Sequence, residues 1–431
     1  MRVPGDKSIS HRAVLLGAVS DRPIQVQGFL RSADTLATVA AVRALGVRVE
    51  EQEPETLHIH GTGWDGLAEP DDVIDVRNAG TLMRLLPGLV APCPFLVVLT
   101  GDASIRRRPM SRVLGPLAEM GASVWGRDGD RLPPVGVRGG DLRGITHRMT
   151  VASAQVKSCI LLAGLRARGE TTVVEPGPSR DHTERLIRAA GGRVEREGPP
   201  TGPGTVRVTP VERLALPDLR IPGDFSSAAF PLVAALLVPD SEVTVEALGL
   251  NPTRTGLLAV LGAMGARLTV VPVTEPAGAE AAGGEPLGAV TAATSDLAAV
   301  EIGGGDVPLM IDELPIWALA AARARGISRL RDARELRVKE SDRLAAVAAL
   351  LRALGIRVEE HDDGLDIEGR PDGWEGGTVV THGDHRLAMV GGVAGLASRR
   401  GVAVDDIACI DVSFPGFIDT MNRLTNGGEA A

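Results

Sequence analysis

The stretch "VRALGVRVE" (residues 42–50) decides the fold, because its pattern returns four more times along the chain. Each copy joins an apolar helical run, a glycine and alternating apolar residues, which predicts a helix, the glycine that ends it and a strand. The further copies are "LAEMGASVW" (117–125), "IRAAGGRVE" (187–195), "LGAMGARLTV" (261–270) and "LRALGIRVEE" (351–360). Their spacing indicates about six units of roughly 72 residues, which together would fill the chain.

A doubled phrase divides these units into two halves. "PGDKSIS" begins at Pro4, and "PGDFSS" begins 218 residues later at Pro222. Three units in each half predict an α/β protein of two lobes, formed by residues 6–222 and by residues 1–5 with 223–431. A cleft between the lobes is the expected ligand site. The stretch 274–288, rich in Gly, Ala, Pro and Glu, is expected to be a surface insertion.

Composition excludes several classes of function. The net charge of −9 argues against a nucleic-acid partner. The three cysteines lie far apart, which argues against a zinc site and a disulfide framework. The first residues contain no apolar stretch, and the longest apolar run, 228–239, is too short to span a bilayer. We therefore expect a cytoplasmic protein with no membrane partner. Because tyrosine is absent, proton transfer would depend on Asp, Glu, His or Lys.

Five helix entrances carry the same kind of polar chemistry. They are "DKSISHRAVLL" (6–16), "RNAGTLMRLL" (77–86), "SAQVKSCILLAGL" (153–165), "KESDRLAAVAALLRALG" (339–355) and "GDHRLAMVGG" (383–392). Free N–H groups and the helix dipole make a helix start an anion site, and arginine matches carboxylate or phosphate. A single Ser, Asp or Asn at such a place is usually only a cap. Five such starts together favour a shared ligand with several negative charges.

The motifs of this chain resemble those of the 5-enolpyruvylshikimate-3-phosphate synthase family. They occur in the family's order from residue 3 to about 417 and read "PGDKSISHR", "NAGTLMRLL", "LTGDASIRRRPM", "SAQVKS", "IDELPIWALAA", "RVKESDRL" and "GDHRLAM". The resemblance implies an inside-out α/β barrel of six βαβ-type units in two lobes. It also implies transfer of the enolpyruvyl group of phosphoenolpyruvate (PEP) to the 5-hydroxyl of shikimate 3-phosphate, with no cofactor or metal, by a monomer.

The resemblance also implies which side chains bind the two anionic substrates. The PEP phosphate would face Lys7, Gly80, Arg108 and Gln155, and the PEP carboxylate would face Arg343 and Arg386. Shikimate 3-phosphate would face Ser8, Arg12, Ser153, Arg180 and Lys339, and its hydroxyls would face Asp312. The substrate-binding set is completed by Asn78, Ala154 and His385.

Four residues are implied to be catalytic. Asp312 would accept the proton of the 5-hydroxyl, and Glu340 would protonate the PEP methylene with Lys339 beside it. Lys7 is the fourth member of the set. The chemistry requires these types, because one acid and one base must act at opposite ends of the new bond. Fixed cations would hold the leaving phosphate.

Four positions depart from the pattern of some relatives. Val412 stands where one branch of the family has a lysine, and Ala154 replaces one of two paired serines. Ser179 stands in place of a tyrosine and Glu335 in place of an asparagine. These differences change individual contacts and leave the expected reaction unchanged.

Two alternatives stand beside this interpretation. UDP-N-acetylglucosamine enolpyruvyl transferases carry a reactive cysteine before "RP" and a Lys-Asn pair in the first motif. This chain has Ala103 at the first place and Ser8 after Lys7 at the second. A non-catalytic repeat scaffold that binds anions would keep the apolar repeat, but it would not require Asp312 and Glu340 together with the arginines.

Overall fold

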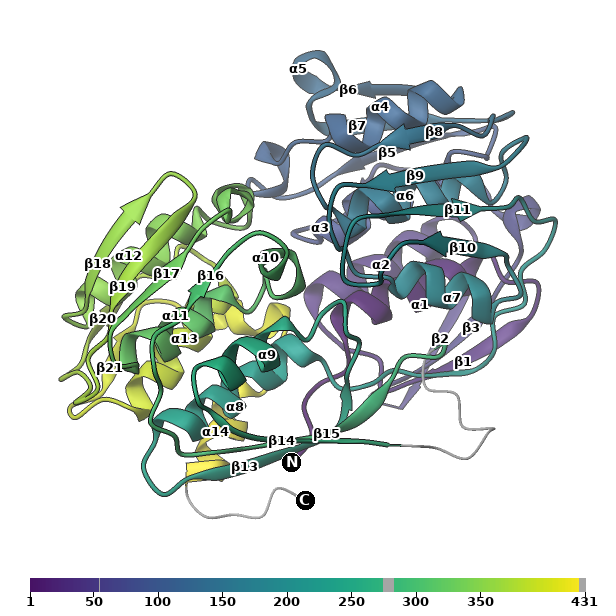
Figure 1. Ribbon diagram of the computed structural model, residues 1–431. Helices are drawn as coiled ribbons and strands as arrows, with labels where there is room; N and C mark the ends of the chain where they lie inside the picture. The colour runs from purple at the N-terminus through teal and green to yellow at the C-terminus, as the bar shows by residue number, and fades with distance from the viewer. Residues whose placement is uncertain (54, 274–282, 426–431) are drawn as a thin grey trace. The chain divides into compact units, whose positions relative to one another are not determined.

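The protein is described by a computed structural model that covers residues 1–53, 55–273 and 283–425 (Figure 1). Two compact units are present. The N-terminal unit contains Gly5–Pro222 and Glu275–Glu285. Of Glu275–Glu285, the structure describes residues 283–285. The C-terminal unit contains Met1–Pro4, Gly223–Thr274 and Pro286–Ala431. Residues 274–282 of the expected surface insertion lie outside the described residues.

The helices of the N-terminal unit are α1 Lys7–Ala18, α2 Ala33–Ala44, α3 Gly80–Val90, α4 Ser111–Met120, α5 Arg127–Asp130, α6 Ala154–Gly164 and α7 His182–Ala189, with 3-10 turns η1 Trp64–Gly66 and η2 Ile105–Arg107. Those of the C-terminal unit are α8 Phe225–Leu237, α9 Gly256–Ala263, α10 Asp306–Leu309, α11 Leu314–Arg323, α12 Arg343–Ala353, α13 His385–Leu396 and α14 Phe417–Thr425, with η3 Arg334–Val338 and η4 Ala408–Val412.

The strands of the N-terminal unit are β1 Pro23–Gln27, β2 Arg48–Glu53, β3 Thr56–His60, β4 Ile74–Asp75, β5 Leu96–Thr100, β6 Ser123–Gly126, β7 Leu132–Arg138, β8 Thr146–Arg148, β9 Thr171–Glu175, β10 Val194–Glu197, β11 Gly204–Val208 and β12 Leu219–Arg220. Those of the C-terminal unit are β13 Glu242–Gly249, β14 Arg267–Pro272, β15 Leu287–Ala293, β16 Glu301–Ile302, β17 Ile327–Leu330, β18 Arg357–His361, β19 Gly364–Glu368, β20 Gly377–Val379 and β21 Val402–Val404.

Within the described residues, these strands form six sheets that share one plan. The four-stranded sheets are ordered β12-β1-β3-β2, β4-β5-β7-β6, β8-β9-β11-β10 and β16-β17-β19-β18. Each pairs two strands in parallel at one edge and then adds two antiparallel strands. The sheet β13-β15-β14 has only the antiparallel part, and β20-β21 only the parallel pair. The expectation of about six related units is confirmed.

The five repeated glycines end helices as the sequence predicts. They follow α2, α4, α7, α9 and α12, and each precedes one of the strands β2, β6, β10, β14 and β18. Gly46, Gly121, Gly191, Gly265 and Gly355 all have positive φ, from 80° to 109°. This left-handed conformation favours glycine because a Cβ atom would be strained there.

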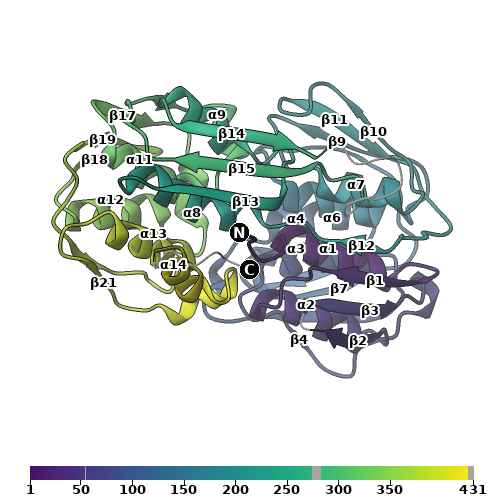
Figure 2. The ribbon, with the colours of Figure 1, turned by 90° about the horizontal axis from the view of Figure 1, so that it is seen from below.

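Helices form the interior of each unit, and sheets lie outside them. The helices α1, α3 and α6 of the N-terminal unit, and α8, α11 and α13 of the C-terminal unit, are almost entirely buried. Figure 2 shows β13, β15 and β14 side by side over α8. Small residues allow close helix packing: a Cβ atom on Gly88 of α3 would lie 2.1 Å from the carbonyl oxygen of Cys159 in α6. The inside-out α/β expectation is confirmed.

The doubled phrase gives both units the same helix start. Asp6 caps α1, and its carboxylate accepts a hydrogen bond from the Ile9 amide at 2.9 Å. Asp224 caps α8 and accepts from the Ser227 amide at 3.2 Å. Such caps satisfy N–H groups that a helix start leaves without an intrahelical partner.

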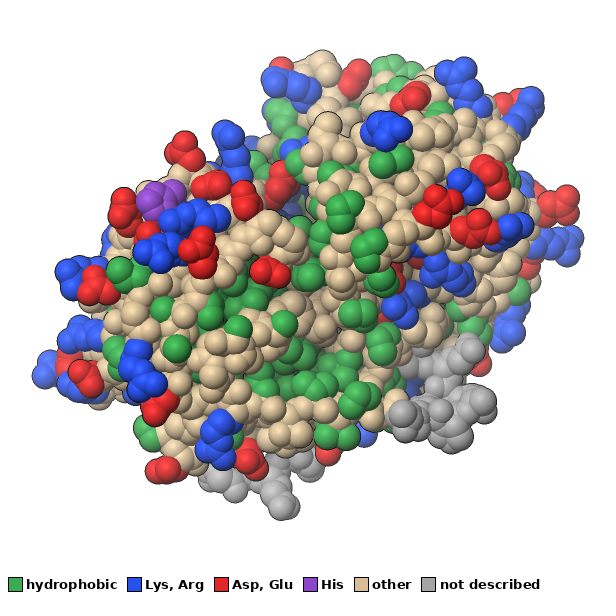
Figure 3. Space-filling view, in the orientation of Figure 1, with side chains coloured by type: hydrophobic (Ala, Val, Ile, Leu, Met, Phe, Trp, Pro, Cys, Tyr) green, Lys and Arg blue, Asp and Glu red, His purple; other side chains and the backbone are tan. Residues whose placement is uncertain are grey.

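One face of the described residues shows mixed charge. On the face drawn in Figure 3, basic and acidic side chains lie beside one another over both units, without a large area of one sign. This distribution is unlike the basic stripe that nucleic-acid-binding proteins carry. In the described part of the chain, each helix is too short or too polar to cross a lipid bilayer.

Candidate functional site

The first residues of α1 place Lys7 and Ser8 at a helix start. Lys7 forms an ion pair with Asp34, which lies in the first turn of α2 and is almost fully buried. The Ser8 carbonyl oxygen accepts a hydrogen bond from Arg12 at 2.9 Å. Asp34 therefore fixes the direction of the Lys7 side chain, which remains partly exposed to solvent.

Arg12 connects three helices of the N-terminal unit. Its guanidinium donates to Thr183 of α7 at 2.7 Å and to Ser158 of α6 at 3.0 Å. Burial lowers the pKa of Arg12 to about 10, although the Glu184 carboxylate opposes this shift. A guanidinium that stays charged at neutral pH in so buried a place is suited to a buried anion.

His11 of the same helix gives a testable stability effect. It is fully buried and shares a 2.6 Å hydrogen bond with Thr38 of α2. Burial first, and then the charges of Lys7 and Arg12, hold its pKa well below the usual value. As pH falls below about 6.5, the unfolded chain therefore takes up a proton before the folded chain, and up to about 1.4 kcal/mol of stability is lost per pH unit.

Chemical denaturation at several pH values checks this expectation for His11. The His11→Gln variant should lose less stability than the wild type between about pH 6.5 and pH 5.5. Equal slopes for the wild type and the His11→Gln variant would contradict a neutral, buried His11.

Gly80, Asn78 and Arg108 lie together around the start of α3. Arg108 donates to the Asn78 side chain at 3.4 Å, and Asn78 donates to Asp102 at 2.6 Å. A Cβ atom on Gly80 would lie 2.9 Å from a guanidinium nitrogen of Arg108 and 3.1 Å from one of Arg84. A side chain at position 80 would therefore push these two guanidinium groups away from the helix start.

The start of α6 lies beside the start of α3. Ser153 caps α6, and its hydroxyl accepts from the Val156 amide at 3.4 Å. Ala154 is the first residue of α6, and Gln155 donates to Thr81 of α3 at 3.1 Å. The half-buried Arg180 lies in the loop between β9 and α7. The N-terminal unit thus brings the starts of α3 and α6 together, while Arg12 links α1 with α6 and α7.

The C-terminal unit gathers a second set of charges around Arg343, the first residue of α12. Its side chain is only 1% exposed. The guanidinium contacts Asp384 at 2.8 Å, Glu340 at 2.7 Å and Asp312 at 3.4 Å. Asp384 caps α13, so one buried cation connects that helix start with two half-buried carboxylates.

The other predicted residues of this unit lie in or next to this cluster. An Arg386 guanidinium nitrogen lies 3.8 Å from Asp312, so two arginines contact the same carboxylate. His385 is buried beside Arg386 at the start of α13. Lys339 is half-buried and directly precedes Glu340.

The charges of the Arg343 cluster shift the pKa values of Arg343 and Asp384. Burial alone would lower the pKa of Arg343, but the carboxylates of Asp384, Glu340 and Asp312 together raise it above its usual value. Burial alone would raise the pKa of Asp384, but the charge and hydrogen bonds of Arg343 outweigh burial, and this pKa is lowered. Both side chains are therefore charged at neutral pH.

The four departures from the family pattern lie in both units. The Ser179 hydroxyl donates to Glu175 at 2.5 Å, within its own loop. Ala154 offers no hydroxyl at the start of α6. Glu335 lies in η3, and Val412 is the last residue of η4.

Sequence reasoning did not assign roles to three charged residues that hold the predicted ones. Asp34 pairs with Lys7, Asp384 pairs with Arg343, and the fully buried Lys157 pairs with two glutamates. Asp384 lies inside the motif "GDHRLAM" and Lys157 inside "SAQVKS", so the sequence did mark both positions. Their partners could not be predicted, because they lie 41 residues away for Asp384 and 18 residues away for one partner of Lys157.

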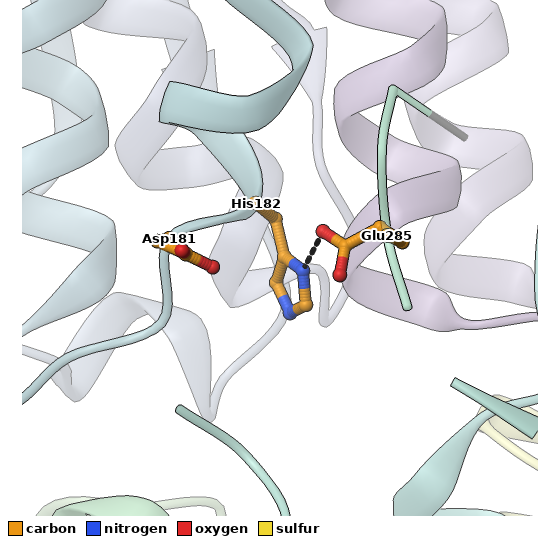
Figure 4. Close-up of side chains that lie close together, drawn as sticks. All are labelled: Asp181, His182 and Glu285. Atoms are coloured by element: carbon orange, nitrogen blue, oxygen red, sulfur yellow. Dashed lines mark hydrogen bonds and ion pairs between the residues drawn. The ribbon is translucent and has the colours of Figure 1, made fainter. Parts of the chain in front are cut away.

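One group of possible metal ligands lies near Arg180. Figure 4 shows Asp181 before α7 and the His182 ring pointing toward Glu285, which comes from a distant segment of the chain. His182 and Glu285 contact at 2.7 Å, and both are buried. Arg185 lies 2.9 Å from Asp181 and 4.0 Å from Glu285. Because Asp181 already pairs with Arg185 and Glu285 with His182, we assign no metal to this group.

Comparison with known proteins adds evidence from outside the chain. Residues 1–421 match the family model described as EPSP synthase (3-phosphoshikimate 1-carboxyvinyltransferase). A curated relative from Desulforudis audaxviator, named 3-phosphoshikimate 1-carboxyvinyltransferase, is 49% identical over 98% of this chain and 96% of its own length. A second relative of that name, from Geobacter metallireducens, is 48% identical over 98% and 95%.

Solved structures show the same similarity. An EPSP synthase from Acinetobacter baumannii has a TM-score of 0.85 and 41% identity, covering 98% of this chain and 95% of that chain. The enolpyruvyl transferase NikO from Streptomyces tendae has a TM-score of 0.76 at 20% identity, covering 99% and 94%, and shows similarity of fold. The family match favours the main interpretation over the two alternatives. The chain belongs to the EPSP synthase (3-phosphoshikimate 1-carboxyvinyltransferase) family.

Proposed function

We propose that this chain transfers the enolpyruvyl group of PEP to the 5-hydroxyl of shikimate 3-phosphate and releases phosphate. The observation that carries the proposal is the Arg343 cluster, in a chain that matches the family over residues 1–421. A buried arginine there contacts both Asp312 and Glu340, the two carboxylates that the chemistry needs. A scaffold that only binds anions would have no need of these carboxylates.

Glu340 is the acid and Asp312 the base of the proposed reaction. Glu340 protonates the methylene carbon of PEP, which creates positive character at C2, and the 5-hydroxyl oxygen attacks C2 while Asp312 accepts its proton. The tetrahedral intermediate then loses phosphate, which leaves with the proton that Asp312 had accepted, and a proton of the new methyl group returns to Glu340. One bond from carbon to oxygen has formed and one has broken.

Arg343 connects substrate binding with the acid in this proposal. Its guanidinium contacts Glu340 at 2.7 Å. A PEP carboxylate bound by Arg343 and Arg386 competes for the same guanidinium. Substrate binding would thereby loosen the contact between Arg343 and Glu340.

The remaining residues bind and orient the two substrates. In the N-terminal unit, Lys7, Gly80, Arg108 and Gln155 hold the PEP phosphate, with Asn78 supporting Arg108. Shikimate 3-phosphate is bound by Ser8, Arg12, Ser153, Ala154, Arg180 and Lys339, with His385 as a further member of the set. Fixed cations of this kind lower the barrier by positioning and by stabilising the leaving phosphate. A monomer in the cytoplasm stays our expectation for the active form.

A phosphate-release assay tests the proposed function. The chain should release phosphate when shikimate 3-phosphate and PEP are both present, and the product should have the mass of the enolpyruvyl ether. UDP-N-acetylglucosamine in place of shikimate 3-phosphate should give no release. Phosphate release with the nucleotide sugar, or no release with either acceptor, would contradict the proposal.

Replacing Gly80 by alanine should weaken binding of the phosphonate glyphosate, which resembles PEP. The new methyl group would displace the Arg108 guanidinium, because the two would lie 2.9 Å apart. Loss of one charge-assisted hydrogen bond is worth about 1.5–3 kcal/mol, so the inhibition constant should rise roughly tenfold to hundredfold.

The control for Gly80→Ala is a second glycine inside a helix. Gly115 of α4 is exposed, and a Cβ atom there would meet nothing within 4 Å. Gly115→Ala should therefore leave the inhibition constant unchanged. If Gly80→Ala also leaves it unchanged, Gly80 does not line the PEP phosphate site.

A further inference from the structure

The composition of the chain singles out Lys157. The sequence contains 46 lysines and arginines, but only three of them are lysines: Lys7, Lys157 and Lys339. Two of these belong to the proposed catalytic set. Every other residue of this pair of types is an arginine, so Lys157 is the one lysine of the sequence outside that set.

Lys157 lies at the centre of a buried charge network in the N-terminal unit. Its side chain is 0% exposed, and its ammonium group lies 2.6 Å from Glu184 and 3.2 Å from Glu175. Arg196 contacts the second oxygen of Glu175 at 2.5 Å. Two cations thus balance two carboxylates, which makes the burial of a lysine tolerable.

This network holds the loop that carries Arg180. Glu175 is the last residue of β9, where the loop begins, and Glu184 lies in the first turn of α7, just after the loop ends. Within the loop, the Ser179 carbonyl oxygen accepts from Lys157 at 3.4 Å, and the Ser179 hydroxyl donates to Glu175. The Ser179 carbonyl and the Arg180 nitrogen form one peptide group. Lys157 therefore holds the backbone from which the Arg180 side chain extends.

The neighbours of Lys157 on α6 bind shikimate 3-phosphate in the proposed function or contact a residue that does. Ser158 contacts Arg12, which also contacts Thr183 of α7. Ser153 lies one helical turn earlier and caps the helix. Lys157 thus joins the helix that carries Ser153 to the loop that carries Arg180 and to the helix that supports Arg12.

We propose that Lys157 is a positioning residue for shikimate 3-phosphate, which it serves by fixing the Ser179–Arg180 peptide group. The inference rests on the proposed function, which assigns Arg180, Arg12 and Ser153 to that substrate. Lys157 itself does not touch the substrate. Its loss should weaken binding of shikimate 3-phosphate and leave binding of PEP and the chemical step largely unchanged.

The main test is a variant that removes one charge of each sign. Lys157→Met alone leaves two buried carboxylates with one cation and could prevent folding. The double variant Lys157→Met/Glu184→Gln keeps the contacts of Glu175 with Arg196 and Ser179 and avoids this excess of charge. Calorimetry should show shikimate 3-phosphate bound roughly tenfold to hundredfold more weakly, the change expected for one charged hydrogen bond.

Steady-state kinetics and a single variant separate positioning from general stability. The KM for shikimate 3-phosphate should rise in the double variant, while kcat and the KM for PEP stay within about twofold. Glu184→Gln alone keeps the contacts of Lys157 with Glu175 and Ser179, and so should retain most of the affinity. A double variant with wild-type affinity for shikimate 3-phosphate would overturn the inference. Equal increases in the KM values of both substrates would overturn it as well.

Arg180→Met distinguishes this inference from the proposed function. If Arg180→Met weakens shikimate 3-phosphate binding and the double variant does not, the role of Lys157 is wrong and the site assignment stands. If Arg180→Met has no effect on that binding, the site assignment itself is wrong at Arg180, and the role of Lys157 falls with it.

Discussion

Replacing Glu340 by glutamine should lower kcat by about two to four orders of magnitude, which is the usual contribution of a general acid. Glutamine keeps the size and the hydrogen-bonding oxygen near Arg343, but it cannot donate a proton to carbon. Binding of shikimate 3-phosphate, measured by calorimetry, should therefore survive. The phosphate-release assay at saturating substrates gives kcat directly.

A matched control for Glu340 lies in the same unit. Glu360 of β18 has a side-chain exposure of 27%, against 24% for Glu340, and it also pairs with an arginine, Arg337, at 3.1 Å. Glu360→Gln should leave kcat unchanged. Near-normal turnover of the Glu340→Gln enzyme would remove Glu340 as the acid, and an equal loss in both variants would point to a general effect on the fold.

Replacing Arg343 by methionine should destabilise the C-terminal unit by about 3–5 kcal/mol, the usual cost of leaving buried charge without its partner. Asp384 is fully buried and caps α13, and Arg343 contacts it at 2.8 Å. Methionine fills a similar volume but offers no charge. Scanning calorimetry should show a lower Tm for the variant than for the wild type.

The effect of Arg343→Met should depend on pH in a defined direction. In the wild type, Arg343 holds the pKa of Asp384 below its usual value, against the opposing effect of burial. The stability that this pair supplies is present above about pH 4 and is lost as pH falls through the lowered pKa. In the variant, Asp384 can take up a proton at low pH, so the difference in stability should shrink as pH falls toward 4.

The exposed Arg352 of α12 is the control for Arg343. Its side chain is 48% exposed. Arg352→Met should change stability by less than about 0.5 kcal/mol, as surface substitutions usually do. A similar Tm for the Arg343→Met variant and the wild type would show that Asp384 does not depend on Arg343 for its charge.

Local patterns in the sequence predicted the repeated architecture and the helix starts. A glycine that must adopt positive φ, as at Gly46 or Gly355, is determined by the few residues around it. The same holds for Asp6 and Asp224, whose side chains cap helices through contacts three residues away. These features needed no knowledge of how distant segments pack.

The sequence by itself therefore determined the six related units, the starts of the buried helices and the residue types that gather there. Only the tertiary structure decided which charges meet, such as Lys7 with Asp34 and Arg343 with Asp384, or Lys157 with Glu184. The physical reason is range: a cap or a turn forms between neighbours in the chain, whereas a buried ion pair depends on the packing of separate helices. That packing sets both the distance between two charges and how little water lies between them.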